Sequence, residues 1–320
     1  MLRKGDLTQG GITTTLLQFT LQMLAGSLLQ QCYNIADTLI VGQCIGANAL
    51  AAVGSAYTLM VFLISILLGL SMGSGTVFSL QYGAGDLSAL RRSIYVSLLL
   101  IGTVTILLNV AVFLWLDPIL RWLQVPYDIY PLMRNYLWII FWGIVFTFLY
   151  NFYAALLRAV GDSVTPLWFL AVSVVLNIVF DLFLILVLDQ GIEGAAVATV
   201  IAQGTAASGI LLYTYKIRPE LRLHREDMRF DRSSLREITS FSTLTCVQQS
   251  VMNFGILMVQ GLVIVLVRLS WPHSPQQSRS TLSPICPFRS SGMLFPPSLP
   301  RISERGKGIA SAGEYVAHFL

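Results

Sequence analysis

Residues 163–188 decide the class of this protein, and they read SVTPLWFLAVSVVLNIVFDLFLILVL. Eighteen uncharged residues are followed by Asp181 and then by seven more uncharged residues. A helix needs about 20 predominantly apolar residues to cross the hydrocarbon core of a bilayer. The segment therefore predicts a transmembrane helix with one carboxyl group inside it.

Similar charge-poor runs recur along most of the chain. Of its 320 residues, 55% are hydrophobic and 11% are charged, and the mean hydropathy is +0.71. Such a composition excludes an ordinary water-soluble globule. The predicted fold class is therefore an all-α integral membrane protein. We expect seven transmembrane helices, at about residues 12–40, 50–81, 93–116, 133–157, 165–188, 192–216 and 240–267.

The basic residues predict how these helices are oriented. Short cytoplasmic loops of membrane proteins retain Lys and Arg. With the N-terminus inside, twelve of the fourteen basic residues before position 268 fall on cytoplasmic segments, and only Arg121 and Arg134 fall on outer ones. We therefore expect a multi-pass protein with a cytoplasmic N-terminus. The net charge of +4 is then explained by the basic residues that orient the helices in the membrane, so no nucleic-acid partner is expected.

The cysteines give no sign of a metal site or of a disulfide framework. Their spacing matches no CxxC or Cys/His pattern, and three of the four lie in or beside apolar segments. We interpret them as small hydrophobic residues and expect no metal and no cofactor. They are Cys32, Cys44, Cys246 and Cys286.

The composition changes abruptly after Val267. The last 53 residues hold seven of the twelve prolines, ten serines and six of the twenty basic residues, without an apolar run that could cross a bilayer. Two interpretations are open: a disordered Pro/Ser-rich extension over 268–320, or translation in a wrong reading frame.

Two acids lie inside predicted helices, Asp37 and Asp181. A charge at mid-membrane costs roughly 2.5–3.5 kcal/mol on insertion scales, so such residues usually mark an ion path. Asp181 and Thr199 both lie roughly 10–12 Å from the outer ends of their helices at 1.5 Å per residue. Asn177 precedes Asp181 by four residues and shares its helix face.

These positions predict one polar layer in the outer half of the membrane that binds a proton or a monovalent cation. Plainer interpretations remain open for each member. Asp37 could be an interfacial acid at a helix end. Asn177 and Thr199 could be ordinary interhelical hydrogen-bonding residues.

Five motifs, taken in order, resemble the multidrug and toxic compound extrusion (MATE) transporters, and most of all their bacterial branch. The resemblance extends over roughly residues 8–266, and the joint order of the motifs makes it specific although each is weak alone. The motifs are NIADTLIVG at 34–42, GANALAAVG at 46–54, GAGD at 83–86, LRAVGD at 157–162 with Pro166, and NIVFD at 177–181.

The resemblance implies two six-helix lobes that alternate access across the bacterial plasma membrane. It implies export of cationic amphipathic drugs against an inward flow of protons or sodium. Asp37, Asn177, Asp181 and Thr199 match polar positions of the family's N-lobe cation site, and Asn151 matches a further one. Gly161, Asp162 and Pro166 resemble a turn that shapes a loop and binds nothing.

The resemblance also divides the chain. It implies a six-helix N-terminal lobe with the interlobe loop over 1–234, the first helix of a second lobe over 235–267, and a tail over 268–320 outside the family pattern. Without the further helices of a second lobe there is no central cleft, so we expect that these residues alone do not transport. A homodimer of first lobes is one conceivable rescue. The expected partners are a small-molecule drug and the lipid bilayer, and the oligomeric state stays open.

Three other functions compete with the transporter. GAGD at 83–86 matches the GxGD signature of intramembrane aspartyl proteases, but Asp86 falls at the cytoplasmic end of a helix beside Arg91 and Arg92, which favours a helix cap. A lipid-linked sugar flippase should line its cavity with Arg or Lys, and the predicted spans bury none. An inactive structural remnant shares the same fold. We therefore expect a transporter and no enzyme.

Overall fold

The computed structural model describes residues 12–123, 125–224, 227 and 231–270, all within one compact unit, Met1–Cys286. The described residues are helical and contain no strand, which confirms the all-α class. They form α1 (Ile12–Cys44), α2 (Ala47–Gly83), α3 (Leu87–Trp122), α4 (Tyr130–Ala159), α5 (Val164–Leu182), α6 (Gly191–Ile217) and α7 (Arg232–Ser270), with a π-helix η1 (Phe183–Val187) and a short 3-10 helix η2 (Pro219–Leu221).

Each of the seven predicted segments corresponds to one long helix. Among the described residues, five of these helices are long and apolar enough to cross a membrane: α2, α3, α4, α5 with η1, and α6. α1 and α7, with 33 and 39 residues, are also long enough to cross a bilayer. Composition therefore supports five of the seven predicted spans, and the spans at α1 and α7 stay predictions.

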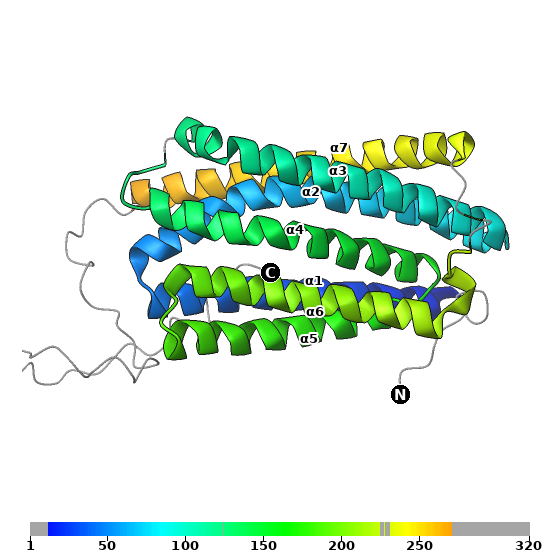
Figure 1. Ribbon diagram of the computed structural model, residues 1–320, viewed down its shortest axis with the longest axis horizontal. Coiled ribbons are helices and arrows are strands. Elements are labelled where there is room, and N and C mark those ends of the chain that lie inside the picture. Colours follow the sequence, from blue (N-terminus) through cyan, green and yellow to red (C-terminus); the bar gives the residue numbers. More distant parts are fainter. Residues whose placement is uncertain (1–11, 124, 225–226, 228–230, 271–320) are drawn as a thin grey trace, which may run out of the picture. The chain divides into compact units, whose positions relative to one another are not determined.

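The long helices lie alongside one another (Figure 1). α4 is central: it packs against α6, α2 and α3. α5 packs mainly on α6 and α1, and α7 packs mainly on α2. This neighbourhood places the helices that carry Asp37, Asp181 and Thr199 next to each other, because α1, α5 and α6 are mutual neighbours.

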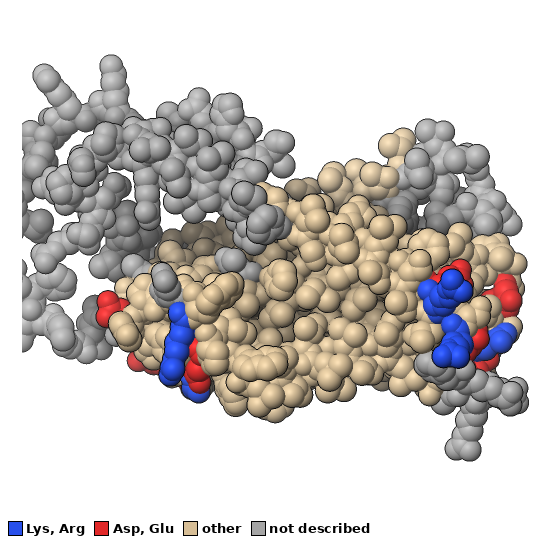
Figure 2. Space-filling model, turned by 90° about the horizontal axis from the view of Figure 1, so that it is seen from above, with Lys and Arg blue, Asp and Glu red and all other residues tan. Residues whose placement is uncertain are grey.

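The charged residues lie mainly near the ends of the helices. On the face shown in Figure 2, Lys, Arg, Asp and Glu gather near the two ends of the helices, and the surface between them is uncharged. An uncharged band flanked by charge suits a bilayer, because the hydrocarbon core cannot solvate ions.

Glycines close the turns between helices. Gly46 follows the end of α1 with φ of +119°, and Gly161 follows the end of α4 with φ of +87°. Side chains with a Cβ rarely adopt these conformations, so the glycines permit the sharp reversals. The reversal between α1 and α2 therefore takes only two residues, Ile45 and Gly46.

Two predictions concern the C-terminal part of the chain, and both stay predictions. The structural interpretation of 268–320 falls almost wholly outside the described residues, which end at Ser270. The division between a first lobe over 1–234 and a separate helix over 235–267 stays a prediction, and α7 itself begins at Arg232.

Candidate cation site

The two intramembrane acids predicted from the sequence lie together. Asp181 on α5 is completely buried, and Asp37 on α1 is half-buried. Their carboxyl groups are close enough to interact electrostatically, but no hydrogen bond joins them among the described contacts. Two ionised carboxylates repel each other, so a proton on one of them or a cation beside them would stabilise the pair.

Thr199 on α6 joins this pair to its polar neighbours. Its Oγ1 accepts a hydrogen bond from Asn177 Nδ2 at 3.3 Å and another from the Tyr33 hydroxyl at 3.4 Å. Thr199 and Asn177 are buried, with exposed fractions of 4% and 0%. Three helices therefore meet through one hydroxyl group. Asn177 and Thr199 share a hydrogen bond, and Asp37 and Asp181 interact electrostatically with Tyr33, the second donor to Thr199. A joint role of Asp37, Asn177, Asp181 and Thr199 in binding a cation stays a prediction.

The acceptors in this cluster outnumber the donors. Among the described residues, no protein donor reaches Asp181 Oδ1, Asp181 Oδ2 or Asn177 Oδ1, and all three oxygens are buried. A buried polar atom without a partner is costly, so natural proteins usually satisfy it or use it. Carboxylate and amide oxygens are suited to a proton or a hard cation.

The sequence analysis missed two features of the site. Tyr136 on α4 is 5% exposed and interacts electrostatically with Asp37, Asp181 and Tyr33. It lies six residues into α4, about 9 Å along the axis at 1.5 Å per residue, but only three residues into the predicted span 133–157, so a depth count from the sequence places it near the interface. The π-helix η1 begins two residues after Asp181. Short π-helical segments occur often at functional sites, but no pattern in the sequence predicts this one.

Asn151 does not share the cluster's hydrogen bonds. Its Nδ2 donates to the carbonyl oxygen of Thr147, one turn earlier on α4, at 2.8 Å. This bond within the helix occupies the amide donor. A role for Asn151 in cation binding therefore stays a prediction without a described contact behind it.

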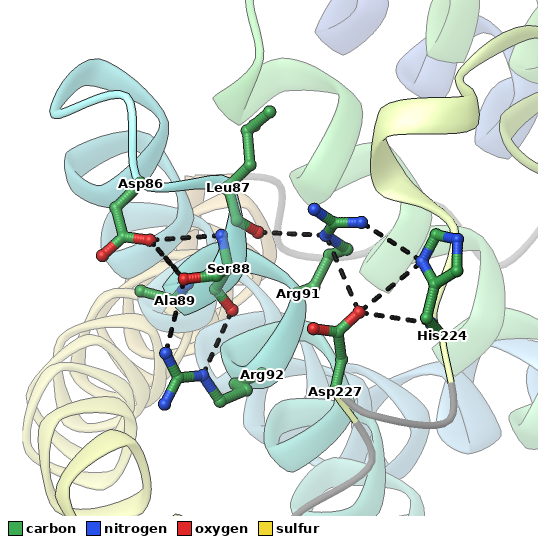
Figure 3. Close-up of polar contacts among 8 residues, drawn as sticks. All are labelled: Asp86, Leu87, Ser88, Ala89, Arg91, Arg92, His224 and Asp227. Carbon is green, nitrogen blue, oxygen red and sulfur yellow. Dashed lines mark hydrogen bonds and ion pairs between the residues drawn. The ribbon is translucent and has the colours of Figure 1, made fainter.

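Asp86 is a helix cap and not half of a protease dyad. Its Oδ1 accepts hydrogen bonds from the backbone nitrogens of Ala89 at 2.9 Å and Ser88 at 3.1 Å, and from the Ser88 hydroxyl at 2.7 Å (Figure 3). These hydrogen bonds lower the pKa of the exposed Asp86 carboxyl group, and the bond from Ala89 has the largest effect. The acid thus satisfies the first turn of α3.

The LRAVGD segment forms the turn expected of it and adds an ion pair. Asp162 Oδ1 accepts from the backbone nitrogen of Thr165 at 3.1 Å and so caps α5. Its Oδ2 lies 3.4 Å from Arg218 Nη2, beyond the end of α6. The turn therefore holds the start of the α6–α7 connection, a contact that spacing alone did not predict.

Comparisons with known proteins agree with this geometry. The MatE family matches residues 23–183, from within α1 to η1. The chain is 37% identical over 211 residues to a probable multidrug resistance protein of Bacillus subtilis, YpnP, covering 66% of this chain and 47% of the relative. A second Bacillus subtilis relative, YoeA, is 30% identical over 271 residues, covering 83% and 53%.

Solved structures share the fold. A MOP superfamily transporter from Pyrococcus furiosus, described as having a binding pocket of reverse polarity, superposes with a TM-score of 0.75 at 22% identity, over 81% of this chain and 57% of that one. An outward-facing multidrug resistance MATE family transporter gives 0.74 at 22%, over 80% and 56%.

The chain spans about half the length of the curated relatives it matches. The matched half includes the helices that carry the acid pair, and the relatives are named as multidrug resistance proteins and not as enzymes. The fold, the motif order and the match over residues 23–183 lead to one conclusion: this chain belongs to the MatE family of multidrug and toxic compound extrusion transporters.

Proposed function

We propose that this chain supplies the cation-binding half of a cation-coupled antiporter that exports cationic amphipathic drugs by alternating access. The transporter would lie in the bacterial plasma membrane with its N-terminus in the cytoplasm. The observation that carries the proposal is the pair of half-buried Asp37 and fully buried Asp181, with three buried acceptor oxygens that no described protein donor reaches. The coupling ion is a proton or sodium.

Electrostatics explain how such a pair would couple two fluxes. Two close carboxylates repel each other in a low-dielectric setting, so loss of the bound cation raises the energy of the site. A cationic drug or an incoming proton or sodium ion relieves that repulsion. Because either cation stabilises the same negative site, the two compete, and competition is what exchange requires.

Acids at this layer also favour a cationic cargo over the pyrophosphate of a lipid-linked sugar. Among the described residues, the cluster contains two carboxyl groups, an amide and hydroxyls, and no Lys or Arg. A site for an anionic headgroup needs basic partners. The exporter is therefore the better electrostatic match.

The proposal can be tested on the chain itself, without transport. In detergent, the thermal unfolding midpoint is measured from pH 5 to pH 8, with 0–300 mM sodium chloride against choline chloride. A ligand at 100 times its dissociation constant stabilises the folded state by about 2.7 kcal/mol. We expect sodium, or acidification, to raise the midpoint in the wild type and to lose most of this effect in Asp181→Asn and Asp37→Asn.

Asp128→Asn is the matched control, because Asp128 is an exposed acid in the turn before α4. It should keep the full response. A response to sodium at constant pH identifies a sodium site, and a response to pH alone identifies a proton site. The proposal is wrong if neither cation distinguishes the wild type from Asp181→Asn.

A further inference from the structure

The connection between α6 and α7 is fastened to the helices before it. At its start, Arg218 Nη2 lies 3.4 Å from Asp162 Oδ2 in the α4–α5 turn, and Arg218 Nη1 lies 3.3 Å from Glu220 Oε1. The neighbouring carboxylates of Glu220 and Asp162 raise the pKa of Arg218 despite its partial burial. Three residues further on, Leu221 is 5% exposed and packs into the main hydrophobic core.

A second fastening lies at the start of α3. Arg91 Nη1 is 3.1 Å from His224 Nδ1, and Arg91 Nε is 3.7 Å from Asp227 Oδ2 (Figure 3). The same Nε donates to the Leu87 carbonyl oxygen at 3.2 Å. The side chains of Arg91 and Asp227 are only 24% and 15% exposed, so solvent screens their attraction less than that of a surface pair.

His224 and Asp227 also hold each other. The backbone nitrogen of His224 donates to Asp227 Oδ2 at 3.3 Å, whereas the ring Nδ1, 3.6 Å from the same oxygen, accepts from Arg91 and so adds no bond to Asp227. One guanidinium of α3 therefore meets two residues of the connection that are already joined. A contact with three partners resists displacement more than an isolated ion pair does.

We propose that Arg91 and Arg218 are positioning residues that clamp the α6–α7 connection to the cytoplasmic end of the first six helices. Asp231, the cap of α7, follows Asp227 by four residues and so lies within about 14 Å of it. The clamp therefore limits where α7 can begin. The consequence for transport rests on the proposed function: the start of α7 moves together with α3 and α4, and any rearrangement of α7 takes place further along that helix.

Packing beside the clamp supports the same conclusion. Ile238 on α7 is fully buried and forms a small cluster with Val77 of α2 and Val96 of α3. Ser234, one turn earlier, is also buried. The first turns of α7 thus lie against the same two helices, α2 and α3, whose connecting turn precedes Arg91.

Hydrogen–deuterium exchange on the full chain in detergent tests the clamp directly. Arg91→Ala should speed amide exchange of the peptide covering 218–224 on the order of tenfold, because the fastening at His224 and Asp227 is lost. Arg92→Ala is the matched control: among the described residues, hydrogen bonds from Arg92 reach only Ser88 of its own helix. It should leave this peptide unchanged.

Exchanging the charges of Arg91 and Asp227 distinguishes a positioning role of Arg91 from a general loss of stability. Arg91→Asp should loosen the connection, and adding Asp227→Arg should restore slow exchange by rebuilding the pair with opposite polarity. Unchanged exchange in Arg91→Ala, equal changes in Arg92→Ala, or no rescue by the swap would each overturn the proposal.

This readout needs neither a bound cation nor transport. Asp181→Asn should leave exchange at 218–224 as in the wild type, and Arg91→Ala should keep the sodium or pH response of the cation site. Failure of the clamp and failure of the proposed function are therefore seen in different variants and different measurements.

Discussion

Thr199 shows how much one hydroxyl group contributes to the site. It accepts hydrogen bonds from Asn177 and Tyr33, and so joins α6 to α5 and α1. Thr199→Val keeps the shape of the side chain but leaves both donors without this acceptor. We expect a loss of about 1 kcal/mol in the free energy of unfolding, because the bonds are long and membrane hydrogen bonds are individually modest. Unfolding in detergent measures it.

Thr199→Ser provides the comparison for this variant. It keeps the hydroxyl and removes only a methyl group, so it should retain the cation response and most of the stability. If the valine and serine variants lose equal stability, the hydrogen bonds to Thr199 contribute nothing and packing explains the effect.

Asp86 gives a pH dependence with a definite sign. Hydrogen bonds from Ala89 and Ser88 lower the pKa of its carboxyl in the folded protein below the ordinary value. A lowered folded pKa adds stability that is present above the unfolded pKa and is lost as the pH falls through the folded pKa. The stability advantage of the wild type over Asp86→Ala should therefore be constant near neutral pH and shrink below about pH 4.

The control for Asp86 is Asp86→Asn, since Asn caps helices without a charge. Its advantage over Asp86→Ala, measured by unfolding in detergent, should not vary over the same pH range. A wild-type advantage that persists unchanged at pH 3 would contradict the role of the ionised cap.

At single residues, the sequence predicts the site best where the depth of a polar side chain in the membrane can be counted from a helix end. Counting residues from the helix ends places Asp181 and Thr199 at one depth; in the structure both are buried and both interact with Tyr33, Thr199 by a hydrogen bond and Asp181 electrostatically. Tyr136 was missed because an aromatic side chain near a helix end is usually an interface residue. Asn151 was included on resemblance alone, and its amide bonds within its own helix.

At the level of helices, α2 and α7 meet through small residues. A Cβ added to Gly69 would lie 2.4 Å from the Cα of Cys246, and one added to Gly73 would lie 2.4 Å from the Cα of Ser242. Ser242 Oγ also donates to the Leu70 carbonyl oxygen at 3.2 Å. Small residues four apart on both helices allow this close approach.

Alanine at Gly69 or Gly73 should therefore separate α7 from α2. The added methyl group meets backbone, which cannot rotate away, so we expect a loss of about 1–3 kcal/mol for each substitution. Gly54→Ala is the control on the same helix, because a Cβ there has nothing within 4 Å. It should be neutral or slightly stabilising. Equal melting temperatures for all three variants would contradict the close contact.

The helices themselves were largely predictable, but their ends and partners were not. α3 was expected over 93–116 and extends over Leu87–Trp122, since hydropathy marks only the apolar part while Arg91 and Arg92 continue the helix. The pairing of α7 with α2 depends on contacts between residues more than 160 positions apart, such as Ser74 and Ser242, and no local pattern contains such contacts.

At the scale of the whole molecule, charged contacts lie at the two ends of the helical bundle. One end carries the Arg91 and Arg218 contacts, and the other carries Arg134, whose Nε lies 2.7 Å from Asp117 Oδ1. The uncharged surface between the ends in Figure 2 fits the hydrocarbon core. The excess of basic residues, twelve against two outside the tail, predicts which end faces the cytoplasm.

Single-cysteine labelling in a cysteine-free background tests that orientation. Tyr127→Cys, at a 96% exposed position between α3 and α4, should react with an impermeant maleimide in intact cells. Lys216→Cys, in the last turn of α6, should react only after the membrane is opened. The two sites are separated by an odd number of described spans, α4, α5 with η1, and α6, so they must face opposite sides. The reverse pattern would invert the orientation, and labelling of both sites in intact cells would contradict the spans themselves.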